Sequence, residues 1–365
     1  MGAALHGRRE FIVGSAALAA LPSLSGCADG GRDDYRAAAD RLRAPISGDA
    51  DFRALVRFAS LAANGHNTQP WRFARHGSGA SILPDFSRRT PVVDPDDHHL
   101  FVSLGCAAEN FLIAAGANGR PGALAFEDGR LDIDLASGPA RTDALYRAIP
   151  ARQSTRSDYD GRAIPGDALR RLEAAARIEG VSVILVTDRG RRETVLEQLV
   201  RANSLQMDDP AFVEELRDWI RFDPSQALAT GDGLFTRCSG NATSPPWLGR
   251  RMFDLFFRKA AENAKYVRQM RSSAGVAVFI GDRQDADHRT RVGRSFQRFA
   301  LQATALGIRH AHINQLVEVP SARAEFARWL GLGAVRPDLA VRFGVAPAMP
   351  MSMRRPAGDV IVARA

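Results

Sequence analysis

The chain is poor in cysteine and lacks several patterns that would define its chemistry directly. Only three cysteines occur in 365 residues, and no group of histidine, cysteine and acidic residues has the spacing of metal ligands, so we expect no metal. A Gly-x-Ser-x-Gly elbow, a Gly-x-Gly-x-x-Gly dinucleotide fingerprint and a phosphate-loop motif are all missing. A disulfide between Cys106 and Cys238 is conceivable in an oxidising compartment, and a small buried thiol at Cys106 is the alternative.

Long hydrophobic runs are also scarce. After residue 26, no uncharged run approaches the roughly 20 residues that a membrane-spanning helix needs. The net charge of +8 is carried mainly by arginine, and the arginines are scattered without a basic tail. This pattern favours an anionic ligand or lipid head groups, and we expect no nucleic-acid partner.

The N-terminal residues read as an export signal. Arg8 and Arg9 form a twin-arginine pattern, and residues 11–24 carry no charge. Residues 24–27 read Leu-Ser-Gly-Cys, which is similar to the lipobox of bacterial lipoproteins. We therefore expect a signal peptide at 1–26, lipidation of Cys27 and attachment to the membrane in the periplasm or cell envelope. The alternative is a twin-arginine signal with an incidental cysteine. A polar tether is expected at 27–50, with a short helix near 35–43.

The chain after residue 50 contains an internal repeat. Five residues spaced along 105–119 match five residues of 293–307 at one constant offset: Gly105, Phe111, Ala115, Ala117 and Gly119 correspond to Gly293, Phe299, Ala303, Ala305 and Gly307. Both stretches have apolar residues at helical spacing and end in glycine, as helices commonly do. Chance similarity of two alanine-rich helices is the alternative.

Helical patterns alternate with single strand-like runs at 71–75, 181–187, 276–280 and 339–343. This alternation predicts an α+β fold with sheet buried between helices. We expect a first half at 51–150 and a second half at 151–365. Helices at 212–221 and 248–271 belong to an insertion at about 205–270 that is long for a connector and could form a lid.

A turn rich in side-chain amides carries the strongest functional signal. Residues 64–71 read Asn-Gly-His-Asn-Thr-Gln-Pro-Trp, and side-chain amides suit a heterocycle that both donates and accepts hydrogen bonds. The segment resembles the Asn-Thr-Gln-Pro-Trp signature of the nitroreductase-like flavoproteins, which bind flavin mononucleotide (FMN). Trp71 is expected in the core instead of stacking on the flavin.

Two further motifs extend this resemblance over about 300 residues. Residues 152–156 read Arg-Gln-Ser-Thr-Arg, similar to a run that the usual dimers of this family supply from the other subunit, and Arg354-Arg355-Pro356 is similar to the phosphate-binding end of the chain. Each motif occurs once, in different halves. The pattern resembles the Acg branch, in which two fused halves pack as an intramolecular dimer with one FMN and a lid. We expect a monomer with one flavin site.

The resemblance implies a role for each residue. Arg152 and Arg355 would hold the phosphate, although either member of the Arg354-Arg355 pair could do so. Ser154 would bond the ribityl chain, and Arg156 would lie near the pyrimidine edge of the ring. The other expected flavin contacts are His66, Asn67, Gln69, Asn314 and Gln315.

Two functions fit these expectations. The first is an FMN-dependent oxidoreductase acting by two-electron chemistry on a small electron-poor substrate, with no catalytic side chain because the flavin carries the chemistry. The second is a non-catalytic protein that binds or stores FMN. An exported protein meets almost no NAD(P)H, and a lid could close over the ring.

Overall fold

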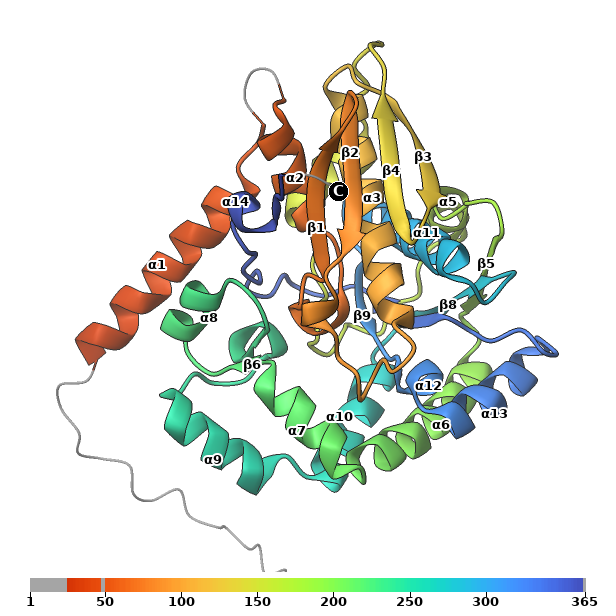
Figure 1. Cartoon of the computed structure of the whole chain (residues 1–365). Coiled ribbons are helices and arrows are strands. Elements are labelled where there is room, and N and C mark those ends of the chain that lie inside the picture. The colour runs from red at the N-terminus through yellow and green to blue at the C-terminus, as the bar shows by residue number, and fades with distance from the viewer. Residues whose placement is uncertain (1–24, 47–49, 364–365) are drawn as a thin grey trace, which may run out of the picture.

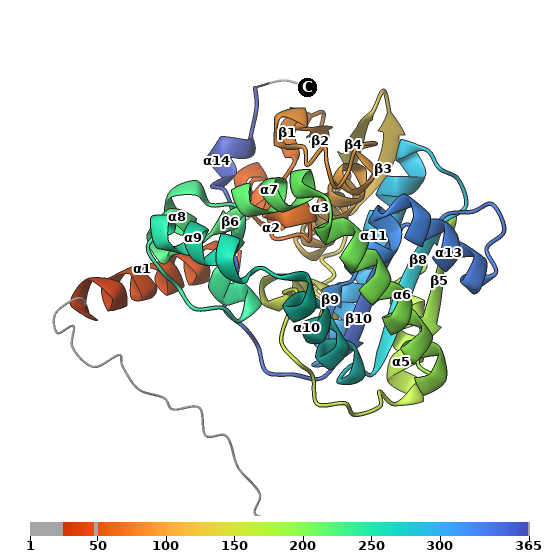
Figure 2. The same cartoon turned by 90° about the horizontal axis from the view of Figure 1, so that it is seen from below.

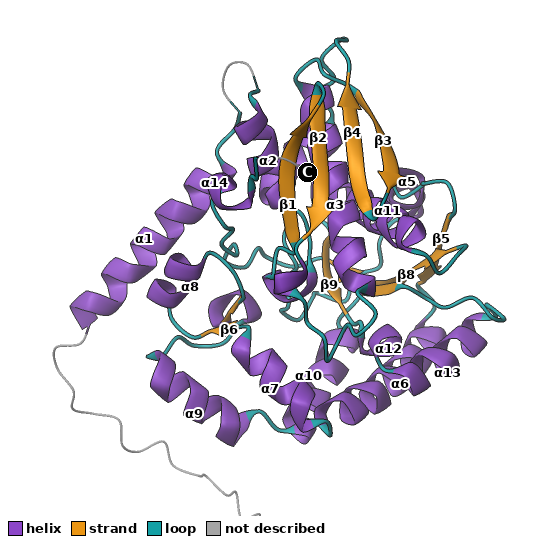
Figure 3. Cartoon of the chain, viewed as in Figure 1, coloured by secondary structure: helices purple, strands orange, loops and turns teal. Residues whose placement is uncertain are grey.

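The computed structural model describes residues 25–46 and 50–363 of the chain (Figure 1). Most of the expected signal peptide therefore lies outside the described residues. The side chain of Cys27 also lies outside them. The expected α+β class is confirmed, because the structure contains two four-stranded antiparallel sheets surrounded by helices (Figure 3).

The two sheets have the same topology. The first contains β1 (Trp71–His76), β2 (Gly79–Pro84), β3 (Gly122–Glu127) and β4 (Arg130–Leu135) in the order β1-β2-β4-β3. The second contains β5 (Val181–Val186), β8 (Gly275–Gly281), β9 (Arg309–His312) and β10 (Leu339–Gly344) in the order β5-β8-β10-β9. Numbered within its own sheet, each has the order 1-2-4-3, so the sequence repeat corresponds to a structural repeat.

A long helix follows the second strand of each sheet, and the two helices cross in the core. These helices are α3 (His98–Ala117) and α11 (Ala286–Ala305). A Cβ atom on Gly105 would lie 1.9 Å from the carbonyl oxygen of Thr290, and one on Gly293 would lie 2.0 Å from that of Val102. These two contacts exchange under the sequence offset of the repeat, as contacts do across a two-fold interface. The matched glycines therefore allow the close approach of the two helices.

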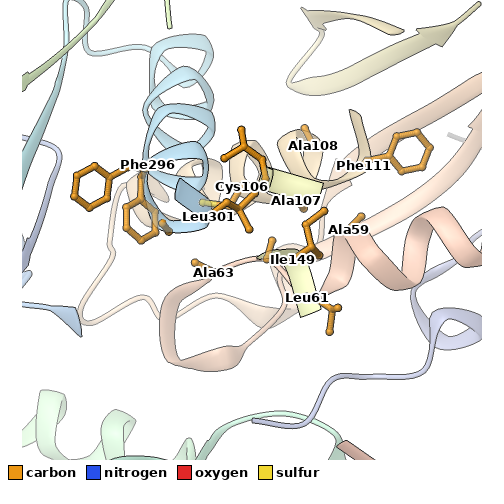
Figure 4. Packing of buried hydrophobic residues seen from close by; sticks show 14 of the residues in the cluster. Ala59, Leu61, Ala63, Cys106, Ala107, Ala108, Phe111, Ile149, Phe296 and Leu301 are labelled. Carbon is orange, nitrogen blue, oxygen red and sulfur yellow. The ribbon is translucent and has the colours of Figure 1, made fainter. Parts of the chain in front are cut away.

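The main hydrophobic core surrounds this crossing. Phe111, Phe296 and Leu301 pack there with Leu61 and Ile149 (Figure 4). Trp71 is fully buried in the same core, as expected. Helix α3 has the length and composition of a membrane span, but 78% of its apolar window is buried, which is the environment of a core helix.

Shorter helices complete each half. In the first half these are α2 (Phe52–Ser60), with an N-cap bond from the amide of Ala54 to Asp51, and α4 (Ala144–Ala148). In the second half they are α5 (Gly166–Ala175), α12 (Gln315–Glu318) and α13 (Pro320–Leu330). Short 3₁₀ turns occur at Gly65–Asn67, Phe86–Arg88 and Ile149–Ala151.

The insertion lies between the first and second strands of the second sheet. It starts with α6 (Arg189–Met207), which packs on α10 and α12. The remaining elements are α7 (Pro210–Asp218), β6 (Ile220–Arg221), α8 (Pro224–Thr230), β7 (Leu234–Phe235), a 3₁₀ turn (Thr236–Ser239), α9 (Pro246–Phe256) and α10 (Lys259–Arg271). In Figure 2, α8 and α9 lie on the left, and α10 lies lower, next to α6. The helix expected at 212–221 corresponds to α7, which ends at Asp218, so that residues 220–221 form β6 instead. The helix expected at 248–271 is divided into α9 and α10.

The expected tether contains a helix that packs against the rest of the molecule. Helix α1 (Ser25–Arg43) lies beside α8 (Figure 1). Tyr35 is buried there, and its hydroxyl donates to the carbonyl of Met351 at 2.7 Å. Arg43 donates to the carbonyl of Ser352 at 2.8 Å. The C-terminal part of α1 is therefore held by the chain's own C-terminal segment.

The segment that follows the last strand of each sheet reaches the other sheet. Ser154, which follows β4 and lies at the start of the second half, forms a parallel bridge with His310 of β9. Ile361, near the end of the second half and after the short helix α14 (Ala357–Val360), forms a parallel bridge with Phe73 of β1. These exchanged segments bring the residues of 152–156 and 353–355 toward the turn at 64–71.

Candidate functional site

A large cavity lies between the insertion and the crossing of α3 and α11. Its volume is about 570 Å³, within the usual range of small-molecule sites. Apolar side chains of α7, α9 and the β6–β7 segment form one wall. Polar side chains from both halves lie on the other walls, and they include His66, His99, Arg156, Asn203, Gln206, Tyr266, His312, Asn314, Gln315 and Glu318.

A smaller cavity of about 50 Å³ adjoins the large one. The two share the residues Ala63, Asn64, Arg156 and Leu234 in their walls. Other walls of the small cavity come from 152–154 and from the C-terminal segment 350–354. The structure thus brings together five of the predicted site residues around this small cavity, namely Asn67, Arg152, Ser154, Arg156 and Arg354.

The small cavity is strongly electropositive. Three guanidinium groups, those of Arg152, Arg156 and Arg354, lie in its wall, and none of the described residues that line it is acidic. Burial lowers the pKa of Arg152 to about 10, and burial followed by repulsion from Arg152 and Arg43 lowers that of Arg354. The side chain of Arg156, whose pKa burial also lowers, makes no hydrogen bond or ion pair with any described residue. A bound anion would relieve both the desolvation and the repulsion.

Arg152 and Arg354 are fixed by the C-terminal end of α2. Arg354 donates to the carbonyl oxygens of Ser60 at 2.7 Å and Ala62 at 3.1 Å, and Arg152 donates to that of Leu61 at 2.8 Å. These bonds satisfy carbonyl groups that a helix end leaves without partners. The Nε atom of Arg152 is buried without a partner, so this arginine keeps a donor for a ligand.

The turn at 64–71 has an unusual backbone. His66, Asn67 and Gln69 have φ values of 47°, 56° and 54°, in the left-handed region that non-glycine residues rarely adopt. Such strained conformations concentrate at functional sites. His66 lines the large cavity, where burial and the neighbouring Arg156 and His99 lower its pKa to about 4, so the ring is neutral at pH 7.

The amides of this turn hold the surrounding chain in place. Asn67 lines the small cavity; its Nδ2 donates to Gly233 and Met353, and its Oδ1 is buried without a partner. Gln69 was predicted to frame the ring, but it lines neither cavity. Its Nε2 donates to the carbonyl of Gly231 at 2.9 Å and its Oε1 accepts from the amide of Arg355 at 2.8 Å. Gln69 therefore connects the insertion and the C-terminal segment to the turn.

The two arginines near the C-terminus have different surroundings. Arg354 lines the small cavity, whereas Arg355 lines neither cavity. The guanidinium of Arg355 donates to the carbonyl of Asp359 at 3.1 Å and lies 3.9 Å from the carboxylate of Asp85. Of the two alternatives for a phosphate contact, the structure places Arg354 at the cavity.

Asn314 and Gln315 line the large cavity and lie after β9, at the start of α12. Asn314 accepts from the amide of Ala340 at 3.1 Å, and Gln315 is bonded to Tyr266 of α10. His310 precedes them. Both of its ring nitrogens are buried without partners, and burial together with Arg152 lowers its pKa. His312 lines the cavity with a pKa lowered to about 3, again chiefly by burial.

Several cavity residues carry no signal in the sequence. Glu318 is partly buried in the cavity wall, and its desolvation there raises its pKa; Gln206 donates to it at 2.8 Å, and His99 lies 3.6 Å away. These residues lie on three elements that are distant in sequence. His99 lies in the first turn of α3, where Asp94 accepts from the amides of His99 and Leu100.

Both described cysteines outside α1 are free and buried. Cys106 lines the large cavity and donates to the carbonyl of Gly293 at the helix crossing, whereas Cys238 lines the small cavity and lies 3.8 Å from the hydroxyl of Tyr35. The conceivable disulfide is not formed. Burial raises the pKa of both thiols, that of Cys106 to about 12.

Comparison with known proteins identifies relatives over most of the chain. Two proteins of Mycobacterium tuberculosis, provisionally named NAD(P)H nitroreductase Rv3131 and NAD(P)H nitroreductase acg, are 26% and 23% identical to it. The first match covers 85% of this chain and 90% of the relative, and the second covers 86% and 96%. No protein-family model matches the chain.

Among solved structures, the chain is similar to an FMN-bound nitroreductase of Bacteroides fragilis, with 18% identity and a TM-score of 0.39. That match covers 60% of this chain and 99% of the other. The FMN-dependent nitroreductase NfnB of Mycobacterium smegmatis, solved with NADPH, matches with 18% identity and a TM-score of 0.37, over 56% of this chain and 87% of that one.

Proposed function

We propose that this chain is an FMN-binding oxidoreductase of the nitroreductase-like type. The observation that carries the proposal is the pair of adjoining cavities: a small one lined by three arginines and a large one lined by apolar and amide side chains. The dianionic phosphate of FMN suits the first and its flat ring suits the second. The relatives that cover most of the chain are named as nitroreductases, which supports the same activity.

The polar atoms of the small cavity fit such a ligand. Three groups have no partner among the described residues: the Nε of Arg152, the guanidinium of Arg156 and the Oδ1 of Asn67. We assign Arg152, Arg354 and Ser154 to the phosphate and ribityl end. Arg156 lines both cavities and is assigned to the junction between the phosphate and the ring.

The bound flavin would supply two-electron chemistry, and the side chains would supply orientation and charge. Arg156 provides positive charge next to the large cavity, which stabilises an anionic reduced ring. His66 and His312 stay neutral at pH 7 because their pKa values are about 4 and 3, so both can donate or accept a hydrogen bond without adding charge. The substrate class is a small electron-poor compound bound in the rest of the large cavity.

A protein that stores FMN without turnover is the second candidate. It is favoured by the insertion, whose α7, α9 and β6–β7 segments form one wall of the large cavity. An absorbance spectrum of the purified protein tests the flavin in both cases. Rapid mixing with NADPH then separates them: bleaching of the flavin band within seconds supports the enzyme, and an unchanged spectrum over an hour supports storage. A colourless chain that does not bind added FMN would refute both.

We further propose that the two halves form an intramolecular counterpart of the family's usual dimer, with one site and a monomeric chain. The reciprocal contacts of Gly105 and Gly293 and the exchanged segments support this arrangement. Light scattering of the detergent-solubilised protein measures it, because a mass of two chains would contradict the monomer.

Export by the twin-arginine route, with lipidation of Cys27 in the cell envelope, is part of the same proposal. The twin arginines and the lipobox-like residues of the sequence support it. Cys27→Ser should abolish incorporation of labelled fatty acid into the protein while leaving export intact. Incorporation that is unchanged in the variant would contradict lipidation.

A further inference from the structure

The insertion carries a concentration of exposed apolar side chains on one short helix. In the described part of the chain, seven large hydrophobic side chains are exposed, and four of them lie within α9. Trp247 is 67% exposed, Leu255 60% and Phe256 69%, and Met252 adds a fourth at 43%. Helix α9 lies at the lower edge of the molecule in Figure 1. An apolar surface on a peripheral helix indicates an interaction site.

The opposite side of the same helix covers the large cavity. Gly249 and Phe253 line it, and Gly249 is buried against Phe222. Met252 and Phe256 belong both to the cavity wall and to the exposed set. Trp247 and Leu255 contribute to neither cavity, so packing inside the molecule does not account for them.

Basic side chains flank this apolar surface. From 246 to 259 the chain carries four basic residues (Arg250, Arg251, Arg258 and Lys259) and one acidic residue, Asp254, which gives a local net charge of +3. Arg250 and Lys259 have exposed carboxylate partners in Asp218 and Asp208. Arg251 and Arg258 form no ion pair with any described residue. Exposed tryptophan, leucine and phenylalanine next to arginine and lysine are the composition of a helix that lies in a membrane interface.

We propose that α9 docks on the surface of a bilayer that contains anionic lipids. The apolar side chains Trp247, Leu255 and Phe256 enter the boundary between head groups and acyl chains, and the flanking cations contact the anionic head groups. A second copy of this chain would satisfy the apolar side chains, but it would place Arg251 and Arg258, which form no ion pair with any described residue, opposite the same cations of the other copy. This proposal depends neither on lipidation of Cys27 nor on the bound cofactor.

Tryptophan fluorescence provides a direct test, because Trp247 is the one exposed tryptophan of the four. The full-length protein is bound to vesicles of phosphatidylcholine and phosphatidylglycerol whose acyl chains carry bromine, a contact quencher. We expect quenching of the emission that Trp247→Phe removes, and weaker quenching on vesicles of phosphatidylcholine alone. Measuring the position of Trp247 separates docking of α9 from attachment through the N-terminus.

Leu255→Ser tests the apolar contribution, with Leu205→Ser as the matched control. Leu205 is 51% exposed but lies on α6, outside the proposed surface. Loss of the leucine should lower the ratio of docked to undocked α9 about tenfold, whereas the control should not change it. Equal quenching in the native protein and Trp247→Phe would overturn the proposal. So would light scattering that shows a dimer disrupted by Leu255→Ser without any quenching, since a second copy would then be the partner.

Discussion

Arg152→Ala tests the proposed phosphate site most directly. Arg152 lines the small cavity, and its buried Nε has no partner among the described residues. It also repels the nearby Arg354, so a bound anion would stabilise both cations. A hydrogen bond to a charged group contributes about 1.5–3 kcal/mol. Loss of this donor and its charge should therefore weaken FMN binding by about 10- to 150-fold, because each 1.4 kcal/mol is about tenfold in affinity.

The comparison ligand is riboflavin, which has the same ring and ribityl chain but no phosphate. If Arg152 contacts the phosphate, Arg152→Ala weakens FMN binding and leaves riboflavin binding unchanged. Free flavin fluoresces and is commonly quenched when bound, so titration of flavin-free protein measures both dissociation constants. Thermal unfolding of the flavin-free variant checks its fold, since Arg152 also bonds the carbonyl of Leu61.

Arg355→Ala is the matched control, because Arg355 is the neighbouring arginine of the predicted pair and lines neither cavity. We expect its FMN affinity to stay within about twofold of the native value, since its contacts are the carbonyl of Asp359 and the more distant Asp85. Equal losses in both variants, or native riboflavin and FMN affinities that do not differ, would refute the assignment of the phosphate to the small cavity.

Two further variants test the fold. Gly105→Ala should lower the free energy of unfolding by roughly 3 kcal/mol or more in chemical denaturation, because its Cβ would lie 1.9 Å from the Thr290 oxygen, whereas Gly116→Ala on the same helix has open space and should be neutral or stabilising. Burial raises the pKa of Asp338 from 3.8 to about 6. Its contribution is therefore fully present below pH 4 and falls by about 2–3 kcal/mol as the pH rises to 6. The stability difference between the native chain and Asp338→Asn should follow that change, and a difference that is constant from pH 4 to 7 would contradict it.

The sequence predicts those parts of the fold where a pattern coincides with burial. The strands β5, β8 and β10 are rich in Val, Ile and Phe, which favours extended structure. The hairpin of β3 and β4 was not predicted. Its strand β3 is mostly exposed and reads Gly-Ala-Leu-Ala-Phe-Glu, so it lacks a long β-branched run, and pairing with β4 in the sheet determines its structure. The strand β9 is only four residues long and contains two histidines, for which local propensity gives no strand signal.

Among the site residues, the arginines of 152–156 and the amide turn could be predicted because short motifs carry them. Gln69 differs from these residues. It lies in the amide turn, but its Nε2 and Oε1 are both hydrogen-bonded to main-chain atoms, so they do not face a cavity. Composition alone cannot reveal this, because it depends on where the insertion folds. The contacts of Glu318 with His99 and Gln206 could not be predicted from the sequence for the same reason, because the three side chains meet only when α3, α6 and α12 pack together.

The duplicated topology is consistent with the single site that we propose. The crossing of α3 and α11 is nearly symmetric, since Gly105 and Gly293 make equivalent contacts in the two halves. The candidate site is asymmetric, because the amide turn follows α2 only and the insertion separates β5 from β8 but not β1 from β2. Two identical subunits would present each feature twice, because one sequence would encode both. In a single chain the two halves differ in sequence, so only the first half carries the amide turn and only the second carries the insertion that forms a cavity wall, while the glycine crossing packs both halves together.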